Sequence, residues 1–182
     1  FHRAQVAGCG LPRLAGSAAA AFARHARRGG HRERRHRAAA RLGAVQALYQ
    51  MDLAGTDVGE TLAQFSARAS GENFDDGQCG EADYKFLREV VDGAVREQAS
   101  IDPAVDAILD KAWPMHRLDA TVRAILRAAA FEIMFMEKVP TRVSISEYLD
   151  VAGAFFGEEE PRFINGVLNT LARSRRPNEF AA

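Results

Sequence analysis

Residues 120–136, ATVRAILRAAAFEIMFM, form the most strongly patterned stretch of the sequence. Their large apolar residues recur with the 3.6-residue period of an α-helix, and Asp119 directly before them is a good N-terminal cap. Further apolar side chains cover the other faces, so we predict a central helix that is almost completely enclosed. Val139-Pro140 then breaks the pattern. The fold should therefore be one in which other segments pack around this helix.

Six other segments show a helical apolar period, and Gly, Pro or polar residues separate them. They span about residues 35–54, 58–69, 82–99, 103–112, 142–156 and 161–174. Asp102 and Pro103 suit the cap and the first position of the helix predicted at 103–112. Residues 70–81 are a polar, Gly-containing loop. Because no segment alternates as a strand does, the sequence predicts an all-α fold of about seven helices.

The charge of the 182-residue chain is segregated, although its formal net charge is zero. Residues 1–37 contain nine Arg and one acid, a net charge of +8, whereas residues 38–182 contain 15 basic and 23 acidic residues, a net charge of −8. A basic arm next to an acidic body favours an anionic partner such as a nucleic acid. Without residues 1–30 the net charge is −5, so the basic surface that acts should be small and local.

The composition places the protein in a reducing compartment, which we interpret as the cytoplasm. Cys9 and Cys79 form neither a disulfide framework nor a zinc-ligand set. No run of 18 apolar residues is present, so no membrane-spanning helix is expected. With 47% hydrophobic residues, the chain can build a core without disulfides or metals.

Catalytic chemistry is not predicted. Four of the five His lie within residues 1–37, and His31 and His36 have no neighbouring Cys or carboxylate pair that would complete a metal site. The acidic run at 158–160 lacks the alternating ligand spacing of a calcium loop. No nucleotide-binding or nucleophile motif is present. We therefore expect a protein that is not an enzyme and needs no metal or cofactor.

Arginines crowd the start of the first predicted helix, and they are Arg32, Arg34, Arg35, Arg37 and Arg41. If this helix extends backward, Arg34, Arg37 and Arg41 lie on one side of it at spacing i, i+3, i+7. The planar guanidinium group binds phosphates in a bidentate manner and stacks on bases, and arginine-rich segments can order on RNA. The alternative is a solvated, flexible charged end, and the spacing alone favours neither.

Two aromatic residues, Tyr49 and Phe163, are candidates for base stacking, and Arg162 next to Phe163 strengthens the second. Both aromatics also lie beside the apolar stripe of a predicted helix. Simple burial in the core is therefore the alternative interpretation.

Four segments, in this order, resemble the NusB family of bacterial transcription antitermination factors. They are residues 44–50 (AVQALYQ) after the Arg-rich start, residues 123–127 (RAILR) followed by Phe131-Glu132 and Val139-Pro140, residues 143–147 (VSISE) and residues 163–168 (FINGVL). Together these segments cover about residues 35–177. Each one is a modest signal, but their order and spacing are specific.

The resemblance implies a helical fold of two packed subdomains and a non-catalytic function. NusB-like proteins pair with NusE, a protein of the small ribosomal subunit. The pair binds the boxA element of nascent ribosomal RNA transcripts and, with other Nus factors, helps RNA polymerase read through terminators. The resemblance also implies RNA contacts from the Arg-rich start and from Tyr49, Arg162 and Phe163. Replacing Arg37 and Arg41 by Ala should then lower RNA affinity and leave the melting temperature almost unchanged.

In this interpretation residues 32–177 form the NusB-like RNA-binding domain. A disordered or non-native basic lead-in at residues 1–31 precedes it, and a tail at residues 178–182 follows. In residues 163–168, we interpret Asn165-Gly166 as structural, with Gly166 allowing another helix to approach closely.

The sequence departs from the family pattern at several points. Ala38-Ala39-Ala40 interrupts the Arg cluster, and Val122 stands where an acidic residue is expected, which puts one polar contact with NusE in doubt. The loop from Gly157 to Phe163 is one residue shorter than usual.

Two other functions stay open. One is the related helical domain of rRNA cytosine methyltransferases, in which case the chain would be a fragment that lacks an S-adenosylmethionine domain. The other is a helical homodimer or scaffold without an RNA role.

Overall fold

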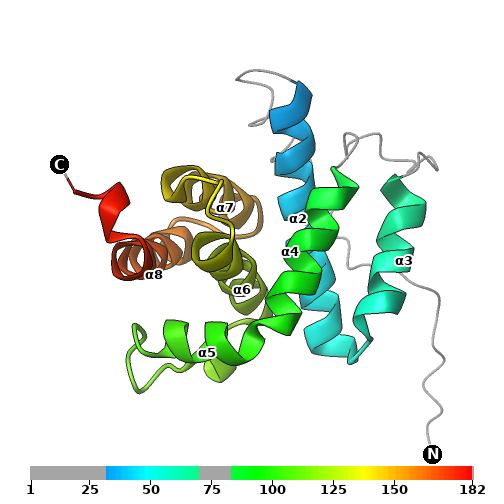
Figure 1. Ribbon diagram of the computed structural model, residues 1–182. Coiled ribbons are helices and arrows are strands. Elements are labelled where there is room, and N and C mark those ends of the chain that lie inside the picture. The colour runs from blue at the N-terminus through cyan, green and yellow to red at the C-terminus, as the bar shows by residue number, and fades with distance from the viewer. Residues whose placement is uncertain (1–31, 70–82, 182) are drawn as a thin grey trace, which may run out of the picture.

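The computed structural model describes residues 32–69 and 83–181. Within these residues it contains seven α-helices, two short 3-10 helices and no strand (Figure 1). The α-helices are α2 (Arg32–Ala54), α3 (Val58–Ala69), α4 (Tyr84–Arg96), α5 (Gln98–Asp106), α6 (Ala120–Phe135), α7 (Thr141–Phe155) and α8 (Glu159–Arg175). The 3-10 helices are η1 (Met115–Arg117) and η2 (Pro177–Glu179). The predicted all-α fold is confirmed, whereas the predicted lead-in at 1–31 and the predicted loop at 70–81 lie outside the described residues.

Helix α6 is the centre of the molecule, as its sequence predicts. It packs against α2, α4, α5, α7 and α8, and ten of its residues, from Val122 to Ile133, are buried. The Asp119 side chain caps it by accepting hydrogen bonds from the backbone N–H groups of Thr121 (2.8 Å) and Val122 (3.4 Å). Local sequence signals thus set both the start and the burial of this helix.

The helices form two packed groups, as the resemblance implies (Figure 1). Helices α2, α3 and α4 lie on one side, and α5 to α8 lie on the other. The groups are joined mainly where α2 and α4 pack against α6. The close approach of α4 and α6 depends on Gly93, because a Cβ atom there would lie 2.0 Å from the ring of Phe131.

The helix predicted at 103–112 is wrong at both ends, because α5 runs from Gln98 to Asp106. The break falls at Glu97 rather than at residues 100–103, and Pro103 lies inside α5. Asp102 does not cap a helix, because its carboxylate accepts hydrogen bonds from Nε (2.9 Å) and Nη2 (2.8 Å) of Arg127 on α6. A long-range ion pair therefore replaces the local cap that the sequence favours.

The residues that follow α8 are held against the start of α7. Glu179 accepts hydrogen bonds from the backbone N–H and from Oγ1 of Thr141, both at 2.8 Å. Nη1 of Arg176 donates to Glu179 (2.9 Å) and to the carbonyl oxygen of Val139 (2.7 Å). Pro140 is the N-cap residue of α7, and its side chain has no group that can accept a hydrogen bond from the first turn. Glu179 provides this cap in its place.

These contacts predict a pH dependence of stability. Although desolvation raises the pKa of Glu179, the hydrogen bonds from Thr141 and Arg176 outweigh it and lower the pKa below the ordinary value of a glutamate. Because the pKa of Glu179 is lower in the folded than in the unfolded protein, its contacts stabilise the fold fully at pH values above the unfolded-state pKa. This stabilisation is lost as the pH falls through the folded-state pKa. Glu179→Gln should therefore lower the melting temperature at pH 7, and the difference from wild type should shrink below about pH 4. A difference that stays constant between pH 3 and 7, measured by thermal melts, would contradict this role.

None of the helices in the described residues is long and apolar enough to cross a membrane.

Candidate nucleic-acid interface

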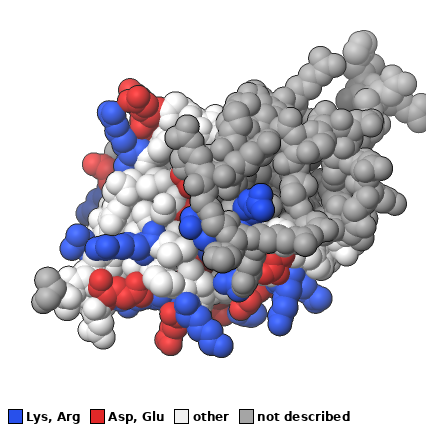
Figure 2. Space-filling view, turned by 90° about the horizontal axis from the view of Figure 1, so that it is seen from above, with Lys and Arg blue, Asp and Glu red and all other residues white. Residues whose placement is uncertain are grey.

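The N-terminal end of α2 presents most of the predicted arginines. The helix begins at Arg32, so the backward extension on which their shared side depends is present. Arg34, Arg35 and Arg37 are exposed. Arg37 lies 3.8 Å from the carboxylate of Asp83, at the start of α4, and its guanidinium carbon lies 5.6 Å from the centre of the Phe86 ring. Figure 2 views the molecule from above Figure 1, and over the described part of that face blue and red side chains are interspersed.

Arg41 differs from the other arginines because it is buried, with only 3% of its surface exposed. Its Nε and Nη2 atoms donate hydrogen bonds to the two carboxylate oxygens of Glu132 on α6, at 3.0 and 2.6 Å. Glu132 is fully buried and also accepts hydrogen bonds from the hydroxyls of Ser144 (2.7 Å) and Tyr148 (3.2 Å) on α7. Arg41 therefore joins α2 to α6 and α7 from within the core.

The electrostatics of this cluster keep Arg41 charged and Tyr148 neutral near neutral pH. Burial lowers the pKa of Arg41, but the hydrogen bonds and the charge of Glu132 outweigh it, so the pKa is raised overall. Burial, followed by the charge of Glu132, raises the pKa of Tyr148 well above its ordinary value. A charged Arg41 and a neutral Tyr148 both donate to Glu132, so the buried carboxylate is satisfied.

A groove lies between the start of α2 and the start of α7, and we call it the basic groove. Arg34 and Arg37 line one side, and Lys138 and Arg142 line the other, around a hollow of about 460 Å³. Val139, Pro140 and Val143 give it apolar surface, and Arg41, Ser146 and Glu147 complete the lining. Burial raises the pKa of Glu147, whose carboxylate lies 3.6 Å from Arg41. The groove is thus positive on both sides.

The other predicted RNA contacts lie on α2 and α8. Tyr49 is half-buried and packs against the core, so burial accounts for part of its surface. Phe163, at the second turn of α8, leaves 40% of its surface exposed. The neighbouring Arg162 donates to Glu158 (2.8 Å) in an ion pair in which both side chains are largely exposed. Phe163 and Arg162 are therefore accessible to a partner.

The interpretation of Asn165-Gly166 as a site of helix approach is wrong. Both residues are exposed, and a Cβ atom on Gly166 would meet nothing within 4 Å. Nδ2 of Asn169 donates to Asn165 Oδ1 (2.7 Å) and to the Asn165 carbonyl oxygen (2.9 Å). Gly166 lies one turn after Arg162 and Phe163, so it leaves the surface beside them flat.

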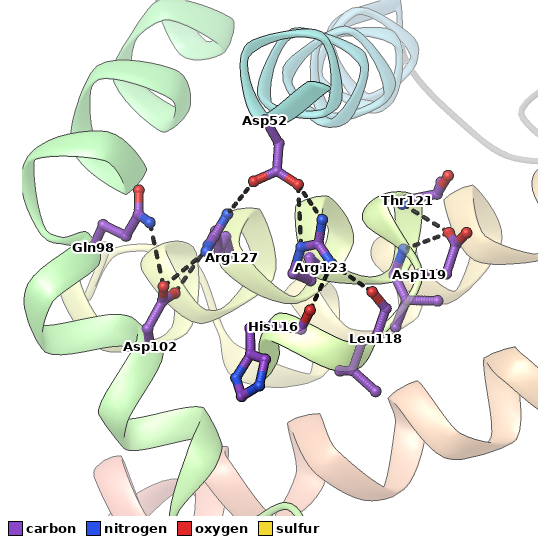
Figure 3. A network of polar contacts seen from close by, with 10 residues as sticks. Asp52, Gln98, Asp102, His116, Leu118, Asp119, Thr121, Arg123 and Arg127 are labelled. Carbon is purple, nitrogen blue, oxygen red and sulfur yellow. Dashed lines mark hydrogen bonds and ion pairs between the residues drawn. The ribbon is translucent and has the colours of Figure 1, made fainter. Parts of the chain in front are cut away.

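A second polar network joins the opposite end of α2 to α6 (Figure 3). The Asp52 carboxylate accepts hydrogen bonds from Arg123, at 3.1 Å from Nε and also from Nη2, and from Nη1 of Arg127 at 3.2 Å. Partial burial raises the pKa of Asp52, but the hydrogen bonds and charges of the two arginines lower it overall. Arg127 also holds Asp102 of α5. The two arginines of the RAILR segment therefore tie three helices together.

Sequence reasoning missed three residues of these sites: Glu132, Lys138 and Arg142. Glu132 carries a usable signal, because a lone carboxylate in an apolar, enclosed helix requires a buried partner. Lys138 and Arg142 flank the Val139-Pro140 break, but nothing local indicates that they face the arginines of α2.

Among the described residues, no three His, Cys, Asp or Glu side chains lie close enough together to hold a metal ion.

Comparison with known proteins identifies the family. The model of the NusB family matches residues 38–173. The chain belongs to the NusB family. A transcription antitermination protein NusB of Rhodopseudomonas palustris (strain HaA2) is 45% identical over 151 residues, which cover 83% of this chain and 89% of that protein. The corresponding protein of Agrobacterium fabrum is 49% identical over 140 residues, covering 77% and 85%.

Solved NusB structures share the fold. T. maritima NusB superimposes with a TM-score of 0.63 at 25% identity, covering 78% of this chain and 94% of that chain. The crystal structure of the antitermination factors NusB and NusE in complex with dsRNA gives a TM-score of 0.64 at 26% identity, covering 77% and 98%. The segments that resemble the NusB family lie on α2, α6, α7 and α8, and α6 contacts each of the others.

Two departures from the NusB pattern now have a structural setting. Val122 is only 4% exposed, so it lies inside the packed body. The family match starts at Ala38, so Arg32, Arg34, Arg35 and Arg37 all precede it. The exposed residues Arg34, Arg35 and Arg37 therefore lie just before the matched segment.

Proposed function

We propose that this chain is a non-catalytic transcription antitermination factor of the cytoplasm. It binds the boxA element of nascent rRNA transcripts together with NusE and so promotes read-through by RNA polymerase in a complex with other Nus factors. The carrying observation is the match, over 83% of the chain, to a protein named as a transcription antitermination factor. The shared fold with a NusB protein that was solved in complex with NusE and dsRNA supports the same conclusion.

The RNA surface consists of two parts in this proposal. The first is the start of α2, where Arg32, Arg34, Arg35 and Arg37 bind phosphates. The second is formed by Tyr49 of α2 and by Arg162 and Phe163 of α8, which contact bases. Exposure of Arg34, Arg35 and Arg37 and of the Phe163 ring supports this division. Because Arg41 is held by Glu132, its part is to fix the position of α2.

The chemistry of the two parts is complementary. Guanidinium groups supply charge-assisted hydrogen bonds to phosphate oxygens, which hold any RNA sequence. An exposed aromatic ring offers stacking worth about 1–3 kcal/mol per base, and the flat surface at Gly166 leaves room for a base to approach it. Since the net charge outside residues 1–30 is −5, attraction to RNA is local and weak, and NusE is needed to hold the RNA firmly.

The proposal predicts RNA binding that depends on the partner. Fluorescence anisotropy of a labelled boxA RNA should show weak binding by this chain alone and clear tightening when NusE is added. Log affinity should fall linearly with log salt, with a slope of about −0.7 for each phosphate contacted. Equal binding of a scrambled RNA, or no effect of NusE, would sink the proposal.

Variants of the same experiment locate the surface. Replacing Arg34, Arg35 and Arg37 together by Ala should reduce the salt slope, whereas Phe163→Ala should weaken binding with the slope unchanged, because it removes stacking and no charge. Arg88→Ala with Lys111→Ala serves as the control, because both cations are exposed and neither lies in the proposed surface. A stable homodimer in gel filtration that dissociates when RNA is added would instead indicate self-association through this surface.

A further inference from the structure

We infer that the basic groove binds the phosphate backbone of the RNA, with Lys138 and Arg142 as a second cationic side opposite Arg34 and Arg37. This inference rests on the proposed function and extends it, because it adds contacts from α6–α7 to those expected from α2 and α8.

The groove is built by segments that are far apart in the sequence. Arg34 and Arg37 are one turn apart on α2, so both point to the same side of that helix. Lys138 lies in the connection after α6, and Arg142 lies in the first turn of α7. All four line one hollow of about 460 Å³, within the range of about 300–1,000 Å³ that is typical of ligand sites.

The charge around the hollow stays positive after its internal pairs are counted. Arg41 in the lining is neutralised by Glu132, so the lining acid Glu147, 3.6 Å from Arg41 and within electrostatic reach of Arg34, counts as one negative charge against the four cations Arg34, Arg37, Lys138 and Arg142. Asp83 lies 3.8 Å from Arg37, which weakens that cation in part. Arg34, Lys138 and Arg142 are exposed, and among the described residues no ion pair to any of them is within 4 Å.

The surface between these cations suits a nucleotide chain better than a compact anion. Pro140 and Val143 expose apolar surface between Lys138 and Arg142, and 43% of Val143 is accessible. Such a surface offers contacts to a ribose or a base while the four cations bind phosphates. The groove therefore combines the two kinds of contact that a single-stranded RNA presents in succession.

The groove lies well away from the aromatic part of the proposed RNA surface. Arg34 precedes Tyr49 by fifteen residues on α2, which corresponds to about 22 Å of helix. An RNA must therefore extend over several nucleotides to reach both parts. Contacts in the groove should therefore increase the affinity for a long RNA. They should not change the affinity for an RNA trimmed to the part that reaches Tyr49 and Phe163.

The test uses a double variant that carries both Lys138→Ala and Arg142→Ala. Its RNA affinity is compared with that of wild type, with NusE present and with boxA RNAs trimmed in steps from either end. With the full-length RNA, we expect about five- to thirty-fold weaker binding, the range that loss of one or two kcal/mol gives. The salt slope should fall by about 1.4, because two phosphate contacts are lost. Trimming from one end should abolish the difference between the two proteins. The melting temperature should not change, since both side chains are exposed.

Two matched variants and one competitor decide the outcome. Lys138→Arg with Arg142→Lys keeps both charges and should bind like wild type, and the remote pair Arg88→Ala with Lys111→Ala should leave the slope unaltered. Wild-type affinity for every RNA in the Lys138→Ala, Arg142→Ala protein would overturn the inference. So would inorganic phosphate that binds the groove without competing with RNA, because the groove would then be a site for a free anion. If wild type itself does not bind boxA RNA with NusE, the proposed function fails, which is a different result.

Discussion

Arg41→Ala is expected to lower the free energy of unfolding by about 3–5 kcal/mol, because it leaves a buried carboxylate without its cation. Glu132 is fully buried, and its two oxygens accept both hydrogen bonds that Arg41 donates. The hydroxyls of Ser144 and Tyr148 remain as donors, but they do not compensate a full negative charge. Chemical denaturation followed by circular dichroism measures the loss.

Arg37→Ala is the matched control, because it removes the same kind of side chain one turn earlier at an exposed position. It should change stability by less than about 1 kcal/mol, as surface ion pairs contribute little. Arg41→Met combined with Glu132→Gln should recover much of the loss, since no charge then stays buried and an amide oxygen can still accept from the two hydroxyls. Similar stabilities of Arg41→Ala and Arg37→Ala would show that the buried pair contributes nothing.

The double replacement of Arg37 and Arg41 that the sequence suggests as an RNA-binding test is therefore unsuitable. It should lower the melting temperature strongly, contrary to the sequence-based expectation, and any loss of RNA affinity would then reflect unfolding. Of these two arginines, only Arg37 can be replaced to test phosphate binding without affecting folding.

Gly93→Ala is expected to destabilise the protein by about 1–3 kcal/mol or more, because it overpacks the contact between α4 and α6. The new Cβ atom would lie between 2.0 and 2.6 Å from three ring atoms of Phe131. Phe131 cannot move aside easily, since it is buried and stacks on Phe135 with ring centres 5.6 Å apart. The higher helix propensity of Ala favours the substitution by up to about 1 kcal/mol. The steric clash with Phe131 costs more than this, so the net change in the free energy of unfolding should be a loss.

Gly166→Ala is expected to have the opposite effect on the free energy of unfolding. Nothing lies within 4 Å of the position of its Cβ atom, so Ala should stabilise α8 by about 0.5–1 kcal/mol. Phe131→Leu in the Gly93→Ala background should restore part of the stability by removing the ring. If both Gly→Ala variants change stability in the same direction, the close packing of α4 on α6 is not the reason for Gly93.

The sequence determines the secondary structure of this protein to a large extent, because helical periodicity, caps and breaks are local signals. The enclosed helix α6, its cap Asp119 and the end of α2 at Gly55, which has a φ of +65°, all follow from neighbouring residues. The same local pattern places Arg34, Arg37 and Arg41 on one side of α2. It also carries the resemblance to the NusB family.

Only the tertiary structure decides which of these residues meet a partner and which meet the core. Arg41 shares a side with Arg37, yet α6 and α7 cover it and bury its charge against Glu132. Asp102 has the sequence context of a cap, but its carboxylate instead accepts a hydrogen bond from Arg127 of α6. Lys138 and Arg142 become part of a groove only because α7 begins beside α2. The physical reason is the same in each case. Contacts between residues of distant segments depend on how the helices pack, and the helical periodicity of one segment does not indicate which other segment packs against it.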